Sequence, residues 1–391
     1  MLDHVVDQMR DDPTTLKTCC LASKSWIHRT RKLLFAHISF NASTRVESWK
    51  KTFPDPTNSP ARHARSLSIR HPHLVTTADV DTITTFCYVE SMDMITDGWN
   101  DERISLTPLH GLSPVLRSLY LSFMFIPDSE IFGLVCSFPL LEDFALVSKG
   151  SIRGGGEWIP PSTSPRLTGS LKLETPFEGI QSITHRLLDL PNGIHFTAIA
   201  VHLLSEQDFE STVDLVSRCA ETLNTLDLTN SHYGVCVSIT LRQIDSLPIP
   251  ADTSGTTGID LSQARKLQDV VFRCGSPHAK WISETLRTTG PENLQQLSLD
   301  LPHHTAIGWE TVHQEWLDLD DLLVEFWATH SLRLVVRAPW KGEKELRDYV
   351  AMFLPELATR GIADLVLCVL NEGNVVPIAA RWPGVFSPGG L

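Results

Sequence analysis

The segment TLNTLDLTN, residues 222–230, decides the fold of this 391-residue chain, because its leucines have the spacing L-x-x-L-x-L. Leucine alternates with polar residues in its second half, which is typical of a short strand that buries one face. The second apolar position of this pattern recurs at residues 67, 92, 119, 144, 171, 199 and 226, in steps of 25 to 28 residues, and again at 270 and 297. A less regular copy lies near Leu332 and Val335. The sequence therefore predicts a strand-forming unit that repeats about every 27 residues.

Helical patterns occupy the spaces between the predicted strands. Residues 128–138 (DSEIFGLVCSF) and 206–219 (EQDFESTVDLVSRC) carry apolar side chains at steps of three and four, which predicts amphipathic helices. A unit of one strand and one helix cannot bury both of its faces alone, so such units stack side by side. The pattern indicates an α/β fold: a divergent leucine-rich-repeat solenoid, with a curved parallel sheet and outer helices, over residues 60–391. The Pro- and Gly-rich stretch LPIPADTSGTTG (residues 247–258) is interpreted as an inserted loop.

The N-terminal segment predicts a small helical module. Asp12-Pro13 is a strong helix start, because proline suits the first helical position and the Asp12 carboxylate can accept hydrogen bonds from free amides. Apolar residues at helical spacing predict three short helices in about forty residues. Cys19 and Cys20 are interpreted as thiols on or beside the packing face, since no second pair of His or Cys lies at the spacing of a metal site. The basic residues here favour a solvated face, or the rim of a protein interface, over a nucleic-acid patch.

This module resembles an F-box, and most closely the F-box proteins of mushroom-forming (basidiomycete) fungi. The resemblance rests on HVVDQM (residues 4–9), DDPTTLKTCCLASKSW (11–26) and LLFAHISF (33–40), with Asp12-Pro13, Leu16, Leu21 and Trp26 as its best markers. Two later segments, EWLDLDDLL (315–323) and FLPELATRGI (353–362), resemble the C-terminal part of the same proteins. The family motif normally opens with Leu-Pro, which is missing here, so we expect an N-terminally incomplete module over residues 1–45.

The resemblance implies a non-catalytic role in ubiquitin transfer. In this family the F-box binds a Skp1-like adaptor and, through it, a cullin, while the rest of the chain binds a protein substrate. The chain is then the substrate-recognition subunit of an SCF-type ubiquitin ligase, with a substrate that the sequence does not identify. The alternative is a stand-alone leucine-rich-repeat interaction scaffold that does not bind the adaptor. By resemblance, the adaptor-binding residues are Val5, Val6, Met9, Pro13, Leu16, Cys20, Leu21 and Trp26.

The predicted strands also suggest a substrate-binding face. Side chains alternate across a strand, so Leu226 and Leu228 point into the core while Asp227 points to the opposite face. The same register predicts a mixed polar surface, which is a plausible ligand surface or simply a solvated one. Our substrate-facing candidates on it are Tyr120, Lys172, Glu174, Asp227, Arg273 and Asp300, and Ser118, Ser122, Asp269, Gln296 and Ser298 share the predicted exposure.

Composition limits the classes of function. The net charge of −13 argues against a nucleic-acid or anionic-membrane binder, because such proteins need a basic field. Eight cysteines without a C-x-x-C pair are typical of reduced, intracellular thiols. No apolar run approaches the roughly 18 residues that a membrane span requires, and the N-terminus is charged where a signal peptide is apolar. We therefore expect a cytoplasmic or nuclear protein with protein partners.

Motifs for catalysis or cofactors are missing from the sequence. It contains no G-x-S-x-G, H-E-x-x-H or G-x-G-x-x-G motif, so no catalytic or cofactor-binding residues are predicted. The histidine pairs His71/His73 and His303/His304 are interpreted as turn residues rather than metal ligands, since no framework supplies further ligands. Residues 309–327 (WETVHQEWLDLDDLLVEFW) predict a core helix with a solvated acidic back. An acidic docking face for a basic partner is the alternative there.

Overall fold

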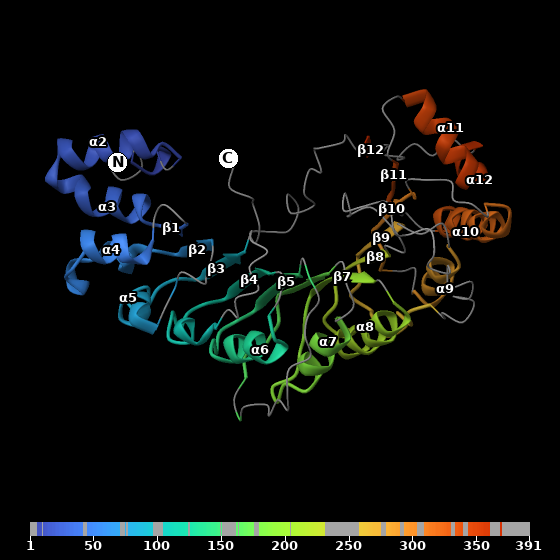
Figure 1. Cartoon of the computed structure of the whole chain (residues 1–391). Helices are drawn as coiled ribbons and strands as arrows, with labels where there is room; N and C mark the ends of the chain where they lie inside the picture. Colours follow the sequence, from blue (N-terminus) through green and yellow to red (C-terminus); the bar gives the residue numbers. More distant parts are fainter. Residues whose placement is uncertain are drawn as a thin grey trace, which may run out of the picture. The chain divides into compact units, whose positions relative to one another are not determined.

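The protein is an α/β protein with parallel strands and outer helices (Figure 1). The computed structural model describes residues 6–9, 11–41, 45–70, 75, 77–96, 105–123, 126–148, 150, 162, 164–175, 180–203, 205–230, 258–274, 279–289, 293–302, 309–329, 333–338, 343–359 and 368–369. Its residues divide into two compact units. Unit 1 comprises Met1–Thr168 and Asp189–Gly193, and unit 2 comprises Gly169–Leu188 and Ile194–Leu391. Within the described ranges, no helix combines the length and the hydropathy that crossing a bilayer demands.

The strands of unit 1 are parallel and follow one another in chain order. The register pairs Leu67 with Met92, Met92 with Leu119, and Leu119 with Phe144. These are the second apolar positions of successive repeats, so the predicted period is confirmed here as direct strand pairing. The strands are β1 (His37–Phe40), β2 (Ser66–Arg70), β3 (Ser91–Ile95), β4 (Ser118–Phe123) and β5 (Asp143–Ser148).

The strands of unit 2 are also parallel and pair at the second apolar position of each repeat. Leu171 pairs with Ile199 and Ile199 with Leu226, and the register continues through Val270 and Leu297. The stacking therefore continues from Leu226 to Val270, and the predicted inserted loop at 247–258 lies, except for Gly258, outside the described residues. The strands are β6 (Ser170–Glu174), β7 (Ala198–Leu203), β8 (Thr225–Asn230), β9 (Asp269–Cys274), β10 (Gln296–Asp300), β11 (Arg333–Ala338) and β12 (Cys368–Val369).

The less regular copy of the pattern, near Leu332 and Val335, was predicted one residue out of register. Leu334, not Val335, pairs with Leu297, and both Leu334 and Val336 are buried. The strand reads RLVVRA, in which three consecutive apolar residues give no alternation to fix the inward face. Leu332 lies outside the described residues.

A recurring backbone contact aligns the start of each strand. The carbonyl oxygen of Asn224 accepts hydrogen bonds from the amides of Gln268 (2.8 Å) and Asp269 (3.1 Å) in the next repeat. The carbonyl of Thr197 does the same for Asn224 (2.7 Å) and Thr225 (3.1 Å). Because each carbonyl has two lone pairs, one oxygen can satisfy two amides at every strand entrance. The same arrangement occurs at Ala36, Arg65, Glu90, Arg117, Gly169 and Gln268.

Helices cover one side of the strands in each unit (Figure 1). The predicted helices at 128–138 and 206–219 are confirmed as α6 (Asp128–Cys136) and α8 (Glu206–Cys219). The core lies between the strands and the helices, where side chains such as Leu226, Leu228 and Ile131 are buried. The other helices that follow strands are α5 (Val80–Ile83), α7 (Ile180–Leu188), α9 (Lys280–Thr288), α10 (Trp309–Thr329), α11 (Glu343–Phe353) and α12 (Pro355–Thr359). Short 3-10 turns occupy Pro56–Asn58, Pro60–His63, Thr77–Asp79 and Thr107–Leu109.

The predicted helix start at Pro13 is confirmed, but Ser23 separates two helices where the pattern predicted one. The helices are α2 (Pro13–Ala22), α3 (Lys24–Leu34) and α4 (Val46–Thr52). Asp12 caps α2, because its Oδ1 accepts hydrogen bonds from the amides of Thr14 and Thr15 at 3.0 Å each. Ser23 ends α2 and caps α3 through the amide of Ser25. Leu16 and Cys19 form the buried side of α2.

The last part of the predicted helical module is a strand. Residues 37–40, which the sequence placed in the helical module, form β1, and β1 pairs with β2. The alternation in HISF, with Ile38 and Phe40 buried and their neighbours exposed, favours a strand over a third helix. Edge-on ring contacts of Phe40 with Trp49 (6.0 Å) and Phe86 (5.8 Å) join this segment to the repeats. Aromatic packing therefore extends past residue 45, where the module was predicted to end.

Gly258 marks a close backbone approach in unit 2. A Cβ atom at this position lies 2.3 Å from the Thr285 nitrogen and 2.5 Å from the Glu284 carbonyl carbon, which is too close for any side chain. The Gly258 amide also donates a hydrogen bond to Glu284 Oε2 at 3.0 Å. We therefore expect Gly258→Ala to lower the free energy of unfolding by about 1 to 3 kcal/mol, as overpacking does. Urea unfolding followed by circular dichroism measures this loss.

Gly133 provides a control, because its replacement by alanine should not lower the free energy of unfolding. It lies inside α6, and a Cβ atom there meets its nearest neighbour, the His110 ring, at 3.4 Å. Alanine favours a helix over glycine by about 0.8 to 1 kcal/mol, so Gly133→Ala should leave stability unchanged or raise it. Equal losses in both variants would contradict the close approach at Gly258.

Candidate functional site

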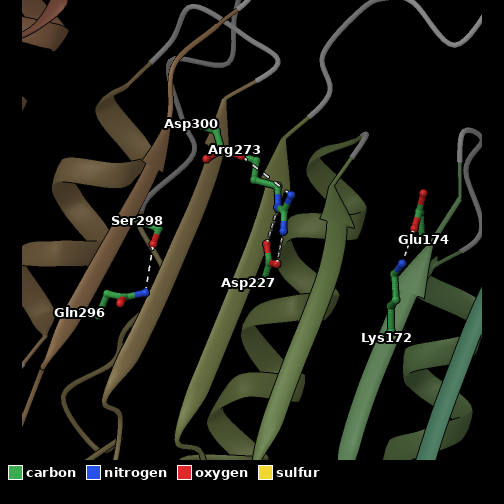
Figure 2. Close-up of polar contacts among 7 residues, drawn as sticks. All are labelled: Lys172, Glu174, Asp227, Arg273, Gln296, Ser298 and Asp300. Atoms are coloured by element: carbon green, nitrogen blue, oxygen red, sulfur yellow. Dashed lines mark hydrogen bonds and ion pairs between the residues drawn. The ribbon is translucent and has the colours of Figure 1, made fainter. Parts of the chain in front are cut away.

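The strand face opposite the helices in unit 2 carries an ion-pair cluster (Figure 2). The cluster comprises two neighbouring groups: Lys172 with Glu174 on β6, and Asp227, Arg273 and Asp300 on β8, β9 and β10. These are five of the six predicted substrate-facing residues. The sixth, Tyr120, is half-buried on β4 in unit 1, so the structure does not bring it into this cluster.

Arg273 is the centre of the larger group. Its Nε and one terminal nitrogen donate to the two carboxylate oxygens of Asp227, at 2.9 Å and 2.7 Å. The other terminal nitrogen lies 3.8 Å from Asp300 Oδ2. The side chains of Arg273 and Asp227 are only 26% and 8% exposed, so this fork-shaped pair is largely shielded from water. Burial alone would lower the pKa of Arg273, but the hydrogen bonds and charge of Asp227, with help from Asp300, raise it above its usual value.

The smaller group has a different environment. Lys172 Nζ lies 2.8 Å from Glu174 Oε2, and both side chains are more than 40% exposed. Burial raises the pKa of Glu174, but the charge and hydrogen bond of Lys172 outweigh this effect and lower the pKa below its usual value. An exposed pair of this kind contributes roughly 1 kcal/mol or less to the free energy of unfolding. The two groups of the cluster therefore differ in their contribution to stability.

His202 on β7 belongs to the same face and was missed in the sequence analysis. Burial lowers its pKa, the charge of Glu174 partly opposes this, and the charges of Lys172 and Arg273 lower it further. The net direction is downward, so the imidazole is neutral at pH 7. The sequence does contain the signal: His202 follows the second inward residue of its strand, as Glu174, Arg273 and Asp300 do in theirs.

Several positions predicted to be exposed are buried. Ser122 and Ser298 are only 2% and 1% exposed, and Ser118 and Asp227 are also buried. The register was right, because these side chains alternate with the buried leucines, but the predicted exposure was wrong. Strands lie only about 4.8 Å apart, so longer neighbours cover a short side chain. Ser298, for example, lies under Gln296, whose side-chain amide is 3.4 Å from the Ser298 hydroxyl oxygen.

The charged side chains of this cluster are paired with one another. Each cationic side chain contacts a carboxylate, so the charges largely neutralise one another. Within the described parts of the chain, no group of three or more His, Cys, Asp and Glu side chains is arranged to hold a metal ion. Both predicted histidine pairs, His71/His73 and His303/His304, lie outside the described residues.

The predicted adaptor-binding residues separate into an inner and an outer set. Val6 and Leu16 are almost completely buried inside unit 1, so they hold the helices together and are not available to a partner. Leu21, near the end of α2, is 90% exposed. Pro13 is exposed, Met9, Cys20 and Trp26 are half-buried, and Val5 lies outside the described residues.

Local contacts fix these helices. The Asp7 carboxylate accepts two hydrogen bonds from Arg29, at 2.8 Å and 2.6 Å, which tie the segment before α2 to α3. The Cys20 Sγ lies 2.7 Å from the Thr30 hydroxyl, so α2 and α3 also contact each other through these side chains. Leu21 is therefore presented outward from a pair of anchored helices.

The predicted inward face of the acidic helix is confirmed. In α10, Trp316, Leu319 and Leu323 are buried, while the acidic side chains of Asp318, Asp321 and Glu325 are exposed. The side chain of Trp327 lies outside the described residues.

Comparison with known proteins gives no family. No protein family model matches the chain, and no curated protein matches it either.

Proposed function

We propose that this chain is the substrate-recognition subunit of an SCF-type ubiquitin ligase. The strand units then form a divergent leucine-rich-repeat solenoid that binds a protein substrate, and the N-terminal helices form an F-box that binds a Skp1-like adaptor and, through it, a cullin. In this role the chain makes no bonds itself and acts by holding the substrate near a conjugating enzyme. Such a subunit works in the cytoplasm or nucleus.

The observation that carries the proposal is the exposure of Leu21. A leucine that is 90% exposed at the end of a helix adds nothing to the core, and its side chain is accessible to a partner. It lies in the segment that resembles an F-box, on helices attached to repeating strand units. The repeats supply what a substrate receptor needs, since stacked parallel strands provide an extended surface for a protein partner.

We expect Leu21→Asp to weaken binding of Skp1 by at least about tenfold, because a charged group replaces an apolar anchor. Since Leu21 is not packed against the core, the variant should keep the circular dichroism spectrum of the wild type. Binding of the full chain to purified Skp1 is measured by isothermal titration calorimetry.

Leu140→Asp is the matched control, because Leu140 is a second exposed leucine in unit 1, outside the N-terminal helices. It should bind Skp1 with unchanged affinity. If the wild-type chain does not bind Skp1, the ligase proposal fails and the stand-alone interaction scaffold becomes the better description.

A further inference from the structure

On the strand face of unit 1, a row of five aligned residues places two larger polar side chains between short ones. The register aligns Ser39, Ser68, Asp93, Tyr120 and Ala145 on β1 to β5, and we call these five residues the Asp93 row. They alternate with the buried residues of each strand, so they share the face opposite the core. Ser68 and Ala145 are short and buried, whereas Asp93 and Tyr120 are larger and half-buried. A carboxylate and a phenol ring therefore stand side by side, between short neighbours.

Asp93 differs from the acidic residues of unit 2. Asp227 is fully engaged by Arg273, but Asp93 makes no hydrogen bond or ion pair with any residue that the structure describes. Burial raises the pKa of the Asp93 carboxyl, and the charge of His37 opposes this shift only in part. His37 itself is exposed, at the start of β1, and its Nδ1 lies 2.9 Å from the Ser66 hydroxyl oxygen.

The chemistry of Asp93 selects for a positive charge. A carboxylate that has lost part of its water without gaining a partner costs free energy, and a cation that pairs with it recovers this cost. Tyr120 stands one strand away, about 4.8 Å along the sheet, where its ring can also attract a cation. Ser39 on β1 is short and exposed, so an extended segment can approach the row from β1.

The other charged side chains named on this face are of both signs. Asp143 is half-buried at the start of β5, one step away from the Asp93 row, and Arg70 lies at the far end of β2. At the centre of the face, the Asp93 carboxylate and the neighbouring Tyr120 ring are the groups that complement a cationic side chain.

We propose that the Asp93 row is a binding site for a lysine or arginine side chain, carried by a basic extended segment of a partner protein that crosses the strands of unit 1. This inference rests on the proposed function only for the identity of the partner as a substrate. The site itself is a property of β2, β3 and β4 and can be tested on the isolated chain.

The test uses a library of N-acetylated, C-amidated hexapeptides of mixed sequence, whose third residue is fixed as Lys, Arg, acetyl-lysine, Gln or Glu. Binding to the full chain is measured by fluorescence anisotropy of labelled pools. We expect the Lys or the Arg pool to bind, and the acetyl-lysine, Gln and Glu pools to bind at least about tenfold more weakly. Comparison of the Lys and Arg pools shows which of the two side chains the site binds more tightly.

Asp93→Asn should remove this preference and weaken the favoured pool by at least about tenfold. Asp81→Asn is the matched control, because Asp81 is exposed on α5 in the same unit and the variant makes the same change in net charge. It should keep the wild-type affinity within about twofold. In the absence of peptide, Asp93→Asn should be at least as stable as the wild type, since it removes an unpaired carboxylate.

Two outcomes overturn the inference. One is a wild-type chain that binds the acetyl-lysine or Glu pool as well as the Lys and Arg pools. The other is an Asp93→Asn variant with unchanged affinity for the favoured pool. Neither outcome affects the ligase proposal, which depends on Skp1 binding through the N-terminal helices. If the chain prefers cationic peptides but does not bind Skp1, the ligase proposal is wrong and the proposed Asp93 site is supported.

Discussion

We expect Asp227→Ala to lower the free energy of unfolding by about 3 kcal/mol, because it leaves the largely buried guanidinium of Arg273 without its main partner. The Asp300 carboxylate, 3.8 Å from Arg273, still attracts the guanidinium in this variant. The expected loss of stability is therefore near the lower end of the range for breaking a buried ion pair. Urea unfolding followed by circular dichroism gives the difference, provided that the transition of the variant has the same m-value as that of the wild type.

Two further variants identify the cause of this loss. The double variant Asp227→Ala with Arg273→Met should recover most of the stability, since no buried charge then remains without a partner. Lys172→Met breaks the neighbouring ion pair on the same face, but Glu174 is 47% exposed and regains water, so the cost should stay below about 1 kcal/mol. Equal losses for Asp227→Ala and Lys172→Met would show that Asp227 and Arg273 are not a shielded pair.

Much of the fold could be predicted because L-x-x-L-x-L fixes two properties at once. The spacing gives the repeat length, and the alternation gives the inward face of each strand. Leu67, Met92, Leu119 and Phe144, chosen by spacing alone, therefore became direct partners in the sheet. Where alternation is missing, as in RLVVRA of β11, the register was wrong by one residue.

The candidate site could be predicted only in part, because orientation does not determine exposure or partnership. The alternation placed Asp227 and Arg273 on one face, but these residues are 46 positions apart across an insertion. Their bidentate contact depends on how far the Arg273 side chain reaches across the strands, which no local pattern encodes. In the N-terminal helices, a resemblance selects Val6 and Leu21 together, whereas packing buries one and exposes the other.

The second large effect is expected in the core of unit 2, where Trp316→Ala should lower the free energy of unfolding by about 4 kcal/mol. Trp316 is completely buried in α10, and its ring meets the Phe353 ring edge-on at 4.8 Å. Tyr349 packs on Phe353 in turn, at 5.0 Å, and its hydroxyl donates a hydrogen bond to the Pro302 carbonyl. Deletion of the indole removes its packing and leaves a cavity between α10 and α11, which such a dense aromatic group cannot refill.

The same group of rings supplies the controls for Trp316→Ala. Trp316→Phe keeps an aromatic ring in the same space, so it should cost less than half as much as the alanine variant. Met352→Ala changes a residue next to Phe353 that is 40% exposed, and it should cost less than about 1 kcal/mol. Because α12 is held to α10 by two amide hydrogen bonds to Asp320, from Glu356 and Leu357, the loss at Trp316 should also weaken α12. Faster amide hydrogen exchange in α10, α11 and α12 would report this local weakening, and exchange that accelerates equally in α5 and α6 would contradict it.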